Sequence, residues 1–382
     1  MIKIKFENLL VSIVVSVVVF FNTISTTMLD RTFFQVKVNF LFLVVLLLGL
    51  RFLYKMRVSY KYLILSILLL LSGGLVYFQT NRLNFLVYSM LLVLLVNVDM
   101  KVVLRNYVVV AGILVVGVFL LSLIGMIPNL QYNRAGVIRN SFGFIYPTDF
   151  ASHCFYLFLA VSYLLKDKFI WTRSLFGVLL SAFIIKYSDA RLNALSILLA
   201  TVIFIYFYYS NGKKLKIFAL LPYSAVIFAS VVTYFSYKFS WSNPFLVSIN
   251  KLITGRLALG RNAFDTFGVH LFGTRNVQFI GSGGKTESVI GYNYVDSSYV
   301  QMLFTYGIVP VVLLLIIYVV ASRKQYKDGQ YLLVAILSLI AFNCMIEAFW
   351  FVPTYNIFMF LLFTTNTFSE KESNDSVTLN IT

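Results

Sequence analysis

The chain is poor in charged residues. Only 12% of its 382 residues are Asp, Glu, Lys or Arg, and only 14 residues are acidic. A soluble domain carries about 25% charged residues, whereas 60% of this chain is hydrophobic. This composition excludes a water-soluble protein and leaves no room for a separate soluble domain.

Cysteine and histidine are also scarce, with two of each. Cys154 and Cys344 both lie in apolar segments and show neither metal-binding nor disulfide spacing, so they do not indicate a redox compartment. With so few histidines and no acidic cluster at ligand spacing, the sequence does not call for a metal. We therefore expect no metal and no cofactor.

Long hydrophobic runs dominate the remainder. A spanning helix needs about 20 residues, and twelve runs of suitable length predict an all-α integral membrane protein with a single polytopic domain over residues 1–382. The expected spans are 8–28, 37–54, 59–78, 84–99, 106–127, 148–165, 169–187, 190–209, 217–239, 298–321, 331–348 and 350–367. The boundaries near 165–190 and 348–350 are weak, so eleven or thirteen spans also fit.

The distribution of basic residues predicts the orientation. The net charge is +17, which in a soluble protein would suggest nucleic acid, but here most of it falls on alternate short connections, as expected for cytoplasmic loops. These residues are Arg51, Lys55, Arg57, Lys61, Lys101, Arg105, Lys166, Lys168, Lys213, Lys214, Lys216, Arg323, Lys324 and Lys327. Both termini, including a tail at 368–382, are then cytoplasmic. The first hydrophobic run lacks a small-residue cleavage site and is interpreted as a retained helix.

Two of the expected external segments are prominent, at about 128–147 and at 240–297. The second is far longer than an ordinary connection, which favours a functional or partly folded segment. In it, Leu252, Leu257, Phe264 and Phe267 recur near helical spacing. Ser248 or Asn250 is a candidate first residue and Gly268 a candidate end. This pattern predicts an amphipathic helix suited to lie on the membrane surface.

Several arginines break the topological pattern because they fall on the external side. They are Arg134, Arg139, Arg191, Arg256 and Arg261. An arginine there is not needed for orientation and is costly near hydrocarbon, so we expect some of them to bind an anion such as a lipid phosphate or pyrophosphate. Snorkelling towards lipid headgroups is the structural alternative. For Arg261, an ion pair with Asp265 four residues on is the favoured interpretation.

Four stretches resemble motifs of the O-antigen polymerase/ligase superfamily, the Wzy-type polysaccharide polymerases of bacterial envelopes. They are Arg139 to Asp149, Ser188 to Asn193, Thr254 to Leu257 with His270 to Gly273, and Asp296 to Tyr299 with Tyr306 and Gly307. Their order and the long external loop match the family over roughly residues 130–310. The first five predicted helices match only by topology.

The resemblance implies a membrane glycosyltransferase that joins undecaprenyl-pyrophosphate-linked oligosaccharide repeat units at the outer face of the bacterial cytoplasmic membrane. The product would be capsule, exopolysaccharide or O-antigen. Arg256, Arg191, Arg139 and Arg261 are the candidate pyrophosphate ligands. The candidate general bases are Asp296, His153 and Asp149, although a packed core histidine and helix-capping carboxylates are the structural alternatives.

The expected partners are the lipid-linked oligosaccharide, the bilayer and, as a candidate, a copolymerase that sets chain length. Nucleic acid is not expected. Ligases of the family carry a histidine where this chain has Asp296, which weakens a ligase interpretation. The main alternative is a flippase of lipid-linked oligosaccharides, but a transporter is expected to show two related halves, and here the halves look dissimilar.

Overall fold

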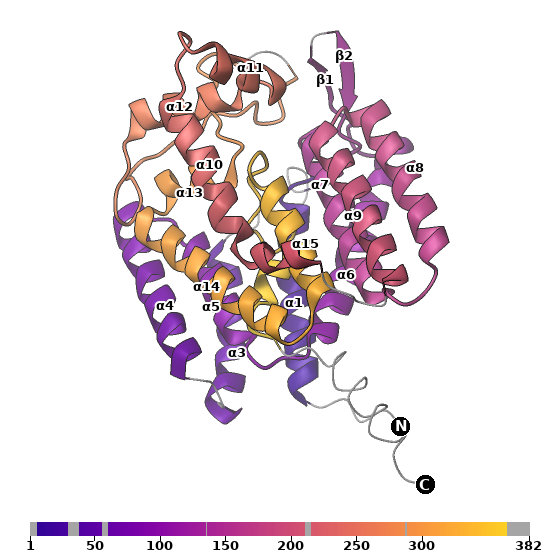
Figure 1. Ribbon diagram of the computed structural model, residues 1–382, viewed down its shortest axis with the longest axis vertical. Helices are drawn as coiled ribbons and strands as arrows, with labels where there is room; N and C mark the ends of the chain where they lie inside the picture. The colour runs from indigo at the N-terminus through magenta and orange to yellow at the C-terminus, as the bar shows by residue number, and fades with distance from the viewer. Residues whose placement is uncertain are drawn as a thin grey trace.

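The computed structural model describes residues 6–29, 38–55, 60–134, 136–210, 215–286 and 289–364. These residues form an almost entirely helical molecule with one small hairpin (Figure 1). The expected tail at 368–382, the basic residues Arg57, Lys213 and Lys214, and the end of the predicted span 350–367 lie outside them. The predicted all-α class is confirmed over the described part of the chain.

The elements follow the hydrophobic runs of the sequence. In chain order they are α1 (Phe6–Ile24), α3 (Val38–Lys55), α4 (Tyr60–Thr80), α5 (Asn84–Leu94), α6 (Met100–Leu123), β1 (Gln131–Arg134), β2 (Val137–Asn140), α7 (Pro147–Leu164), α8 (Ile170–Ser188), α9 (Arg191–Tyr209), η1 (Lys216–Tyr223), α10 (Ser224–Lys238), α11 (Pro244–Leu252), α12 (Arg256–Phe267), α13 (Ser298–Thr305), α14 (Ile308–Lys327), α15 (Tyr331–Asn343) and α16 (Ile357–Phe360).

Local chemistry explains several of the boundaries. Pro147 occupies the first turn of α7, where its missing N–H costs nothing. Asp99 caps α6 by accepting from the Lys101 amide at 2.9 Å. Between α8 and α9 the chain reverses through Asp189, which adopts a left-handed conformation with φ 44°.

Six helices are long and apolar enough to cross a membrane by length and composition. They lie at 62–80, 100–123, 170–188, 191–209, 216–238 and 308–327, and shorter apolar helices accompany them at 8–24, 84–94 and 331–343. The chain is therefore a membrane protein in its helical part, and the predicted count of twelve spans is not confirmed.

The last predicted span, 350–367, is wrong as a continuous helix in its described part. After α15 the chain makes turns from Cys344 to Asn356, and only the four residues of α16 are α-helical. Every residue of this segment, from 344 to 364, is buried or partly buried. Its backbone is satisfied within the protein, for example by the Asn356 side chain, which donates to the Trp350 carbonyl at 2.7 Å and accepts from the Met359 amide at 3.2 Å. Such irregular backbone is tolerated at membrane depth only when protein surrounds it.

The predicted span 298–321 is also interrupted. Gly307, with φ 93°, separates α13 from α14. A Cβ at this position would collide with the backbone of Gly273 and Leu271, so only glycine fits. The long connection is held against Gly307 by a backbone hydrogen bond, in which the amide of Ile308 donates to the His270 carbonyl at 3.0 Å. Two of the motif stretches therefore meet here.

The long connection 240–297 folds against the helices. It contains two helices, α11 and α12, instead of the single predicted amphipathic helix, and the break between them falls at Thr254 and Gly255, both with positive φ. Asn243 caps α11, so neither predicted cap is correct, although Asn250 accepts from the amide of Ala258 in α12. Gly268 ends α12 as predicted.

α12 packs on the protein. Its Leu257 and Ala263 are buried, and a Cβ at Gly260 would collide with Ser236 of α10. The buried face of α12 thus covers α10 and α13, because glycine and alanine let the helix axes approach closely, whereas Leu252, at the end of α11, is 83% exposed.

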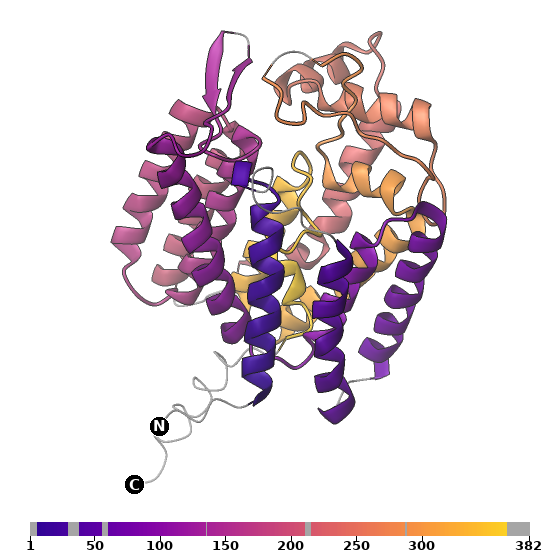
Figure 2. The same ribbon diagram turned by 180° about the vertical axis from the view of Figure 1, so that it is seen from behind.

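The molecule has two distinct ends. β1, β2, α11 and α12 lie at the upper end in Figure 1, and the α7–α8 and α14–α15 connections lie at the lower end. α15 and the buried segment after it run between the group α6–α9 and the group α4, α10, α13 and α14 (Figures 1 and 2). α15 packs on both α9 and α10, so the segment that follows it lies between the two groups of helices.

Candidate functional site

The turn between α8 and α9 gathers one group of charges, which we call the α8–α9 cluster: Arg134, Arg139, Asp189 and Arg191. The Asp189 carboxylate accepts from Arg134 and, at 2.8 Å, from Arg191 Nε. Burial alone would raise the pKa of Asp189, but the hydrogen bonds from Arg191 and Arg134 outweigh it and hold the pKa below its ordinary value. Asp189 is thus an ionised anchor in a cluster that keeps a net positive charge.

The hairpin β1–β2 is fixed on this turn. Ser188 donates its hydroxyl to the Asn140 carbonyl at 3.1 Å, and Arg139 Nε donates to the Ser188 carbonyl at 2.9 Å. The first two motif stretches of the sequence therefore lie in direct contact. Their proximity confirms that they belong to one structural unit.

Arg139 has spare hydrogen-bonding capacity. Its Nη2 atom is buried and has no hydrogen-bond partner among the described residues. Burial, together with the charge of Arg134, lowers the pKa of Arg139 to about 10, so the guanidinium stays charged near neutral pH. An unpaired buried donor on a cation is costly, and an anionic ligand would satisfy it.

Arg191 differs from Arg139 in exposure. Its side chain is 71% exposed and its guanidinium is engaged with Asp189. It can meet a ligand only from the solvent side of the cluster. Its position suits an outer, more screened contact with an anion.

A second group of charges lies at the start of α12, just before α13 and in the segment after α15, and we call it the central cluster: Arg256, Asp296 and Glu347. Arg256 Nε lies 3.2 Å from Asp296 Oδ2. The same guanidinium donates to the carbonyls of Ile346 and Ile253, each at 3.2 Å. Arg256 therefore ties the long connection to the segment that follows α15, with its side chain 17% exposed.

Asp296 does not cap α13. Ser297 is the N-cap residue, it makes no side-chain cap hydrogen bond, and its own hydroxyl oxygen is buried without a partner among the described residues. Burial raises the pKa of Asp296 above its ordinary value, although Arg256 and Arg139 oppose the rise. A carboxylate with a raised pKa and a partly exposed side chain has the properties of a general base.

Glu347 is the residue that the sequence interpretation missed. It is 5% exposed and lies in the irregular segment after α15. One carboxylate oxygen accepts from Asn193 at 3.4 Å, and its backbone carbonyl accepts from Ser298. A lone glutamate in an apolar run could have identified it, because an ionisable side chain inside the membrane is a functional candidate by default.

Glu347 connects the two clusters electrostatically. The charges of Arg256, Asp296, Asp149 and Arg139 all act on its carboxyl group, and those of Glu347 and Arg256 act on Arg139. Two arginines 117 positions apart in sequence, Arg139 and Arg256, thus share one electrostatic environment with three acidic side chains. This convergence makes the upper end of the molecule the candidate site.

Asp149 and His153 lie deeper, on α7. Asp149 sits in the first turn of the helix and is buried. His153 is fully buried, packs against the ring of Tyr355 at 4.3 Å between ring centres, and places Nε2 3.0 Å from the Thr26 hydroxyl. The same hydroxyl lies 2.7 Å from the Thr23 carbonyl. Both positions suit support of the site more than contact with a large glycan.

Arg261 is on a different face of α12. Five residues separate it from Arg256, which corresponds to about 140° around a helix. It forms a bidentate pair with Asp265, at 3.0 and 2.6 Å, and donates to the Tyr237 carbonyl at 2.6 Å. The structure therefore places Arg261 in the ion pair that its spacing indicates, apart from the central cluster.

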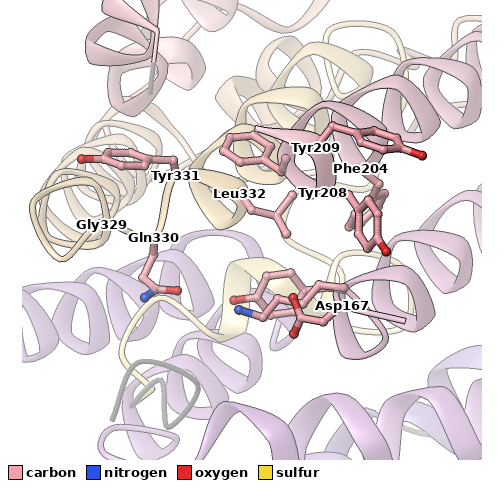
Figure 3. Close-up of a pocket in the computed structure, with 11 residues that line it drawn as sticks. Asp167, Phe204, Tyr208, Tyr209, Gly329, Gln330, Tyr331 and Leu332 are labelled. Carbon is pink, nitrogen blue, oxygen red and sulfur yellow. The ribbon is translucent and has the colours of Figure 1, made fainter. Parts of the chain in front are cut away.

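A cavity of about 690 Å³ lies at the other end of the molecule. Figure 3 shows the side chains that line it, among them Asp167 at the α7–α8 connection, Tyr208 and Tyr209 at the end of α9, and Gln330 and Tyr331 at the start of α15. Its lining includes none of the residues of the two clusters. We place the candidate site by its charges and not by this cavity.

Among the described residues, no group of three or more His, Cys, Asp or Glu side chains could hold a metal ion. Comparison of the chain with protein-family models, with curated proteins and with solved structures gave no match. The functional assignment therefore depends on the site alone.

Proposed function

We propose that this protein is a membrane glycosyltransferase that polymerises oligosaccharide repeat units carried on a lipid pyrophosphate, at the outer face of a bacterial cytoplasmic membrane. The observation that carries the proposal is the central cluster, in which Arg256 pairs with Asp296 at 3.2 Å and donates to the carbonyl of Ile346, next to Glu347. The buried, unpaired Nη2 atom of Arg139 belongs to a guanidinium that acts electrostatically on the same carboxyl groups. The upper end that holds these residues is opposite the α7–α8 and α14–α15 connections, which carry Lys166, Lys168 and Lys327. The positive-inside rule then puts the site outside the cell.

In this proposal, Arg139 and Arg256 bind the donor pyrophosphate. Arg139 contributes its unpaired Nη2 atom, and Arg256 is already fixed by backbone carbonyls, so little side-chain entropy is lost on binding. Guanidinium groups suit phosphate because they donate two parallel hydrogen bonds. Arg191, which is exposed at the start of α9, contacts the pyrophosphate from the solvent side.

The reaction is a displacement at the anomeric carbon of the donor glycan. The acceptor hydroxyl forms the new glycosidic bond, while the bond between the anomeric carbon and the pyrophosphate oxygen breaks and leaves its electron pair on the pyrophosphate. The arginines stabilise the charge that develops on this oxygen, an effect that is strong in a partly shielded site. The lipid pyrophosphate supplies the activation, so no nucleotide is required.

Asp296 is the proposed base, and it takes the proton of the acceptor hydroxyl. It is favoured over Asp149 and His153 because it is partly exposed, while both α7 residues are buried. Glu347 has a positioning role, since its charge and its backbone hold Arg256 and the start of α13 in place. Because Arg256 pairs with Asp296, binding of pyrophosphate to Arg256 would loosen that pair and release the base.

The test uses a strain from which the gene is deleted, complemented with wild type, Arg256→Ala or Lys251→Ala. Lys251 is the matched control because it is an exposed cation near the end of α11, five positions before Arg256 and outside both clusters. We expect wild type and Lys251→Ala to restore a ladder of glycan sizes. Arg256→Ala should leave exported single repeat units on the lipid.

The other possible outcomes identify other functions. Long lipid-linked chains that never reach their acceptor would indicate a ligase. Repeat units that stay on the cytoplasmic face of the deletion strain would indicate a flippase. A normal ladder with Arg256→Ala would contradict the proposed site.

A further inference from the structure

Besides the cavity at the lower end, the molecule has a groove at its upper end, on the far side of α12 from Arg256. This outer groove has a volume of about 700 Å³, and its principal lining residues are Tyr237, Trp241, Arg261, Asn262 and Asp265. It is separate from both charge clusters. Nothing in the proposed chemistry uses it.

The groove combines an exposed aromatic surface with fixed polar groups. Trp241 is 72% exposed, with its indole edge-to-face on Phe239 at 5.1 Å between ring centres. The Arg261 and Asp265 side chains lock each other, and Arg261 also stacks over the Tyr237 ring at 5.6 Å. A sugar presents both C–H faces, which pack on aromatic rings, and hydroxyl groups, which pair with such planar polar groups.

One wall of the groove is supported by a small buried core. Phe239, which lines the groove, packs with Leu246 and Leu257. This core joins the end of α10 to α11 and α12. A preformed surface with oriented polar groups binds a ligand with less loss of conformational entropy than a mobile loop does.

The position of the groove relative to Arg256 indicates which glycan it takes. Asp265 follows Arg256 by nine residues, or about 13 Å along the helix axis. The groove also faces away from Arg256, so a glycan held at both places must pass around α12, which is about 10–12 Å wide with its side chains. A glycan bound at the central cluster reaches the groove only if it is long enough to pass around the helix, and a growing chain meets this condition whatever the length of its repeat unit.

We infer that the outer groove binds the growing polysaccharide chain and retains it between additions. This inference depends on the proposed polymerase function and names a second site for the same substrate class. Simultaneous binding at two sites raises the effective concentration of the chain at the catalytic centre without any new contact there. The groove thus favours long products and is not needed for formation of the first linkage.

The binding test uses the full chain in detergent with Trp171→Phe, so that emission comes from Trp241 and the buried Trp350. The probes are single repeat units and longer chains released by mild acid from the polysaccharide of the producing cell. We expect the longer chains to change the emission. Isothermal titration calorimetry, which needs no tryptophan signal, should show that they bind Trp241→Ala at least about tenfold more weakly, as expected for loss of an aromatic contact of about 1.4 kcal/mol. Trp241→Phe should retain most of the binding.

The product test compares glycan ladders in the deletion strain. We expect Trp241→Ala to shorten the modal chain at least about twofold while single repeat units are still consumed. The control is Trp171→Ala, because Trp171 is 70% exposed and lies at the start of α8, at the opposite end of the molecule. It should leave the ladder unchanged.

Two results would overturn the groove assignment. One is an unchanged ladder with Trp241→Ala in a strain where Arg256→Ala abolishes polymer. The other is emission from Trp241 that is quenched by spin-labelled lipids in nanodiscs and unaffected by either glycan, which would assign the groove to the membrane. A normal ladder with Arg256→Ala would instead reject the polymerase site itself, so the two failures are distinguishable.

Discussion

Replacing Arg256 with alanine tests the central cluster as a structural unit as well as a binding site. The guanidinium is the counter-charge of Asp296 and donates to backbone carbonyls on two segments. Its loss leaves two acidic side chains, Asp296 and Glu347, without their nearest cation. We therefore expect the Arg256→Ala protein to be less stable than wild type.

The size of the effect follows from exposure. Breaking a fully buried pair costs about 3–5 kcal/mol, and an exposed pair contributes about 0.2–1 kcal/mol. The Arg256 and Asp296 side chains are 17% and 27% exposed, between these limits. We expect a loss of about 2–3 kcal/mol in the free energy of unfolding.

The assay is thermal unfolding of purified protein in one detergent at pH 7, with Arg256→Ala, Asp296→Asn and the double variant. The double variant should recover about 1–2 kcal/mol relative to Arg256→Ala alone, because the unpaired carboxylate is gone. Arg261→Ala is the matched control. Its pair with Asp265 is more exposed, so its loss should stay below about 1 kcal/mol.

The double variant also separates stability from chemistry. It should regain stability yet make no polymer, because both a pyrophosphate ligand and the base are missing. If Arg256→Ala unfolds at the wild-type temperature, or if the double variant is no more stable than Arg256→Ala, Arg256 is not the counter-charge of this site and the reasoning fails.

Three further predictions follow from single residues. Burial raises the pKa of Asp296 above its ordinary value of 3.8, and the base must be deprotonated, so the polymerisation rate of reconstituted protein should fall as the pH decreases through a value above 3.8. Asp296→Asn should lower the rate at pH 7 by about 10²-fold or more. A wild-type rate in Asp296→Asn would exclude this base. The pKa of Asp189 is lowered, so the stability that its ion pairs give the fold is present above the ordinary pKa of 3.8 and is lost as the pH falls through the folded-state pKa. Asp189→Asn should lower the Tm at pH 7 and should lose less further stability than wild type on acidification to pH 3. An equal loss in both proteins would argue against the pairing. Gly307→Ala combines a positive φ with a collision against Gly273 and should cost more than about 2 kcal/mol, measured as the loss of folded protein on size exclusion; full recovery of folded protein would refute the close approach.

Much of the helical framework could be predicted from sequence because local chemistry sets it. The run beginning beside Pro147 was placed at 148–165 and lies at Pro147–Leu164. The next two helices fall within one residue of their predicted ends. Alternation of basic connections correctly grouped the α7–α8 and α14–α15 loops at one end of the molecule.

The segment after α15 could not be predicted in the same way. Hydropathy does not distinguish a spanning helix from irregular chain that is enclosed by protein, and the residues from 344 to 364 are buried or partly buried. Its backbone is satisfied by tertiary partners such as Ser298, which is distant in sequence. For the same reason the contacts of Glu347 with Asn193 and Ser298 could not be predicted from the sequence.

Individual charged residues of the two clusters, apart from Glu347, could be identified in the sequence, but their arrangement could not. An external arginine is visible in the sequence, but its partner is not. Arg139 contacts Ser188, and Arg256 pairs with Asp296, contacts that depend on how α8, α12 and α13 pack. Spacing alone correctly predicted the pairing of Arg261, because Asp265 lies one helical turn away.

The most direct test of the central claim measures binding of a lipid pyrophosphate to the purified protein. Undecaprenyl pyrophosphate and undecaprenyl monophosphate would be titrated in nanodiscs against wild type, Arg139→Gln, Arg256→Gln and the control Lys251→Ala. We predict that wild type and Lys251→Ala prefer the pyrophosphate. Each arginine variant should lose about 1.5–3 kcal/mol of that preference, the value of a charged hydrogen bond. Equal binding of the pyrophosphate by wild type and both arginine variants would contradict the account.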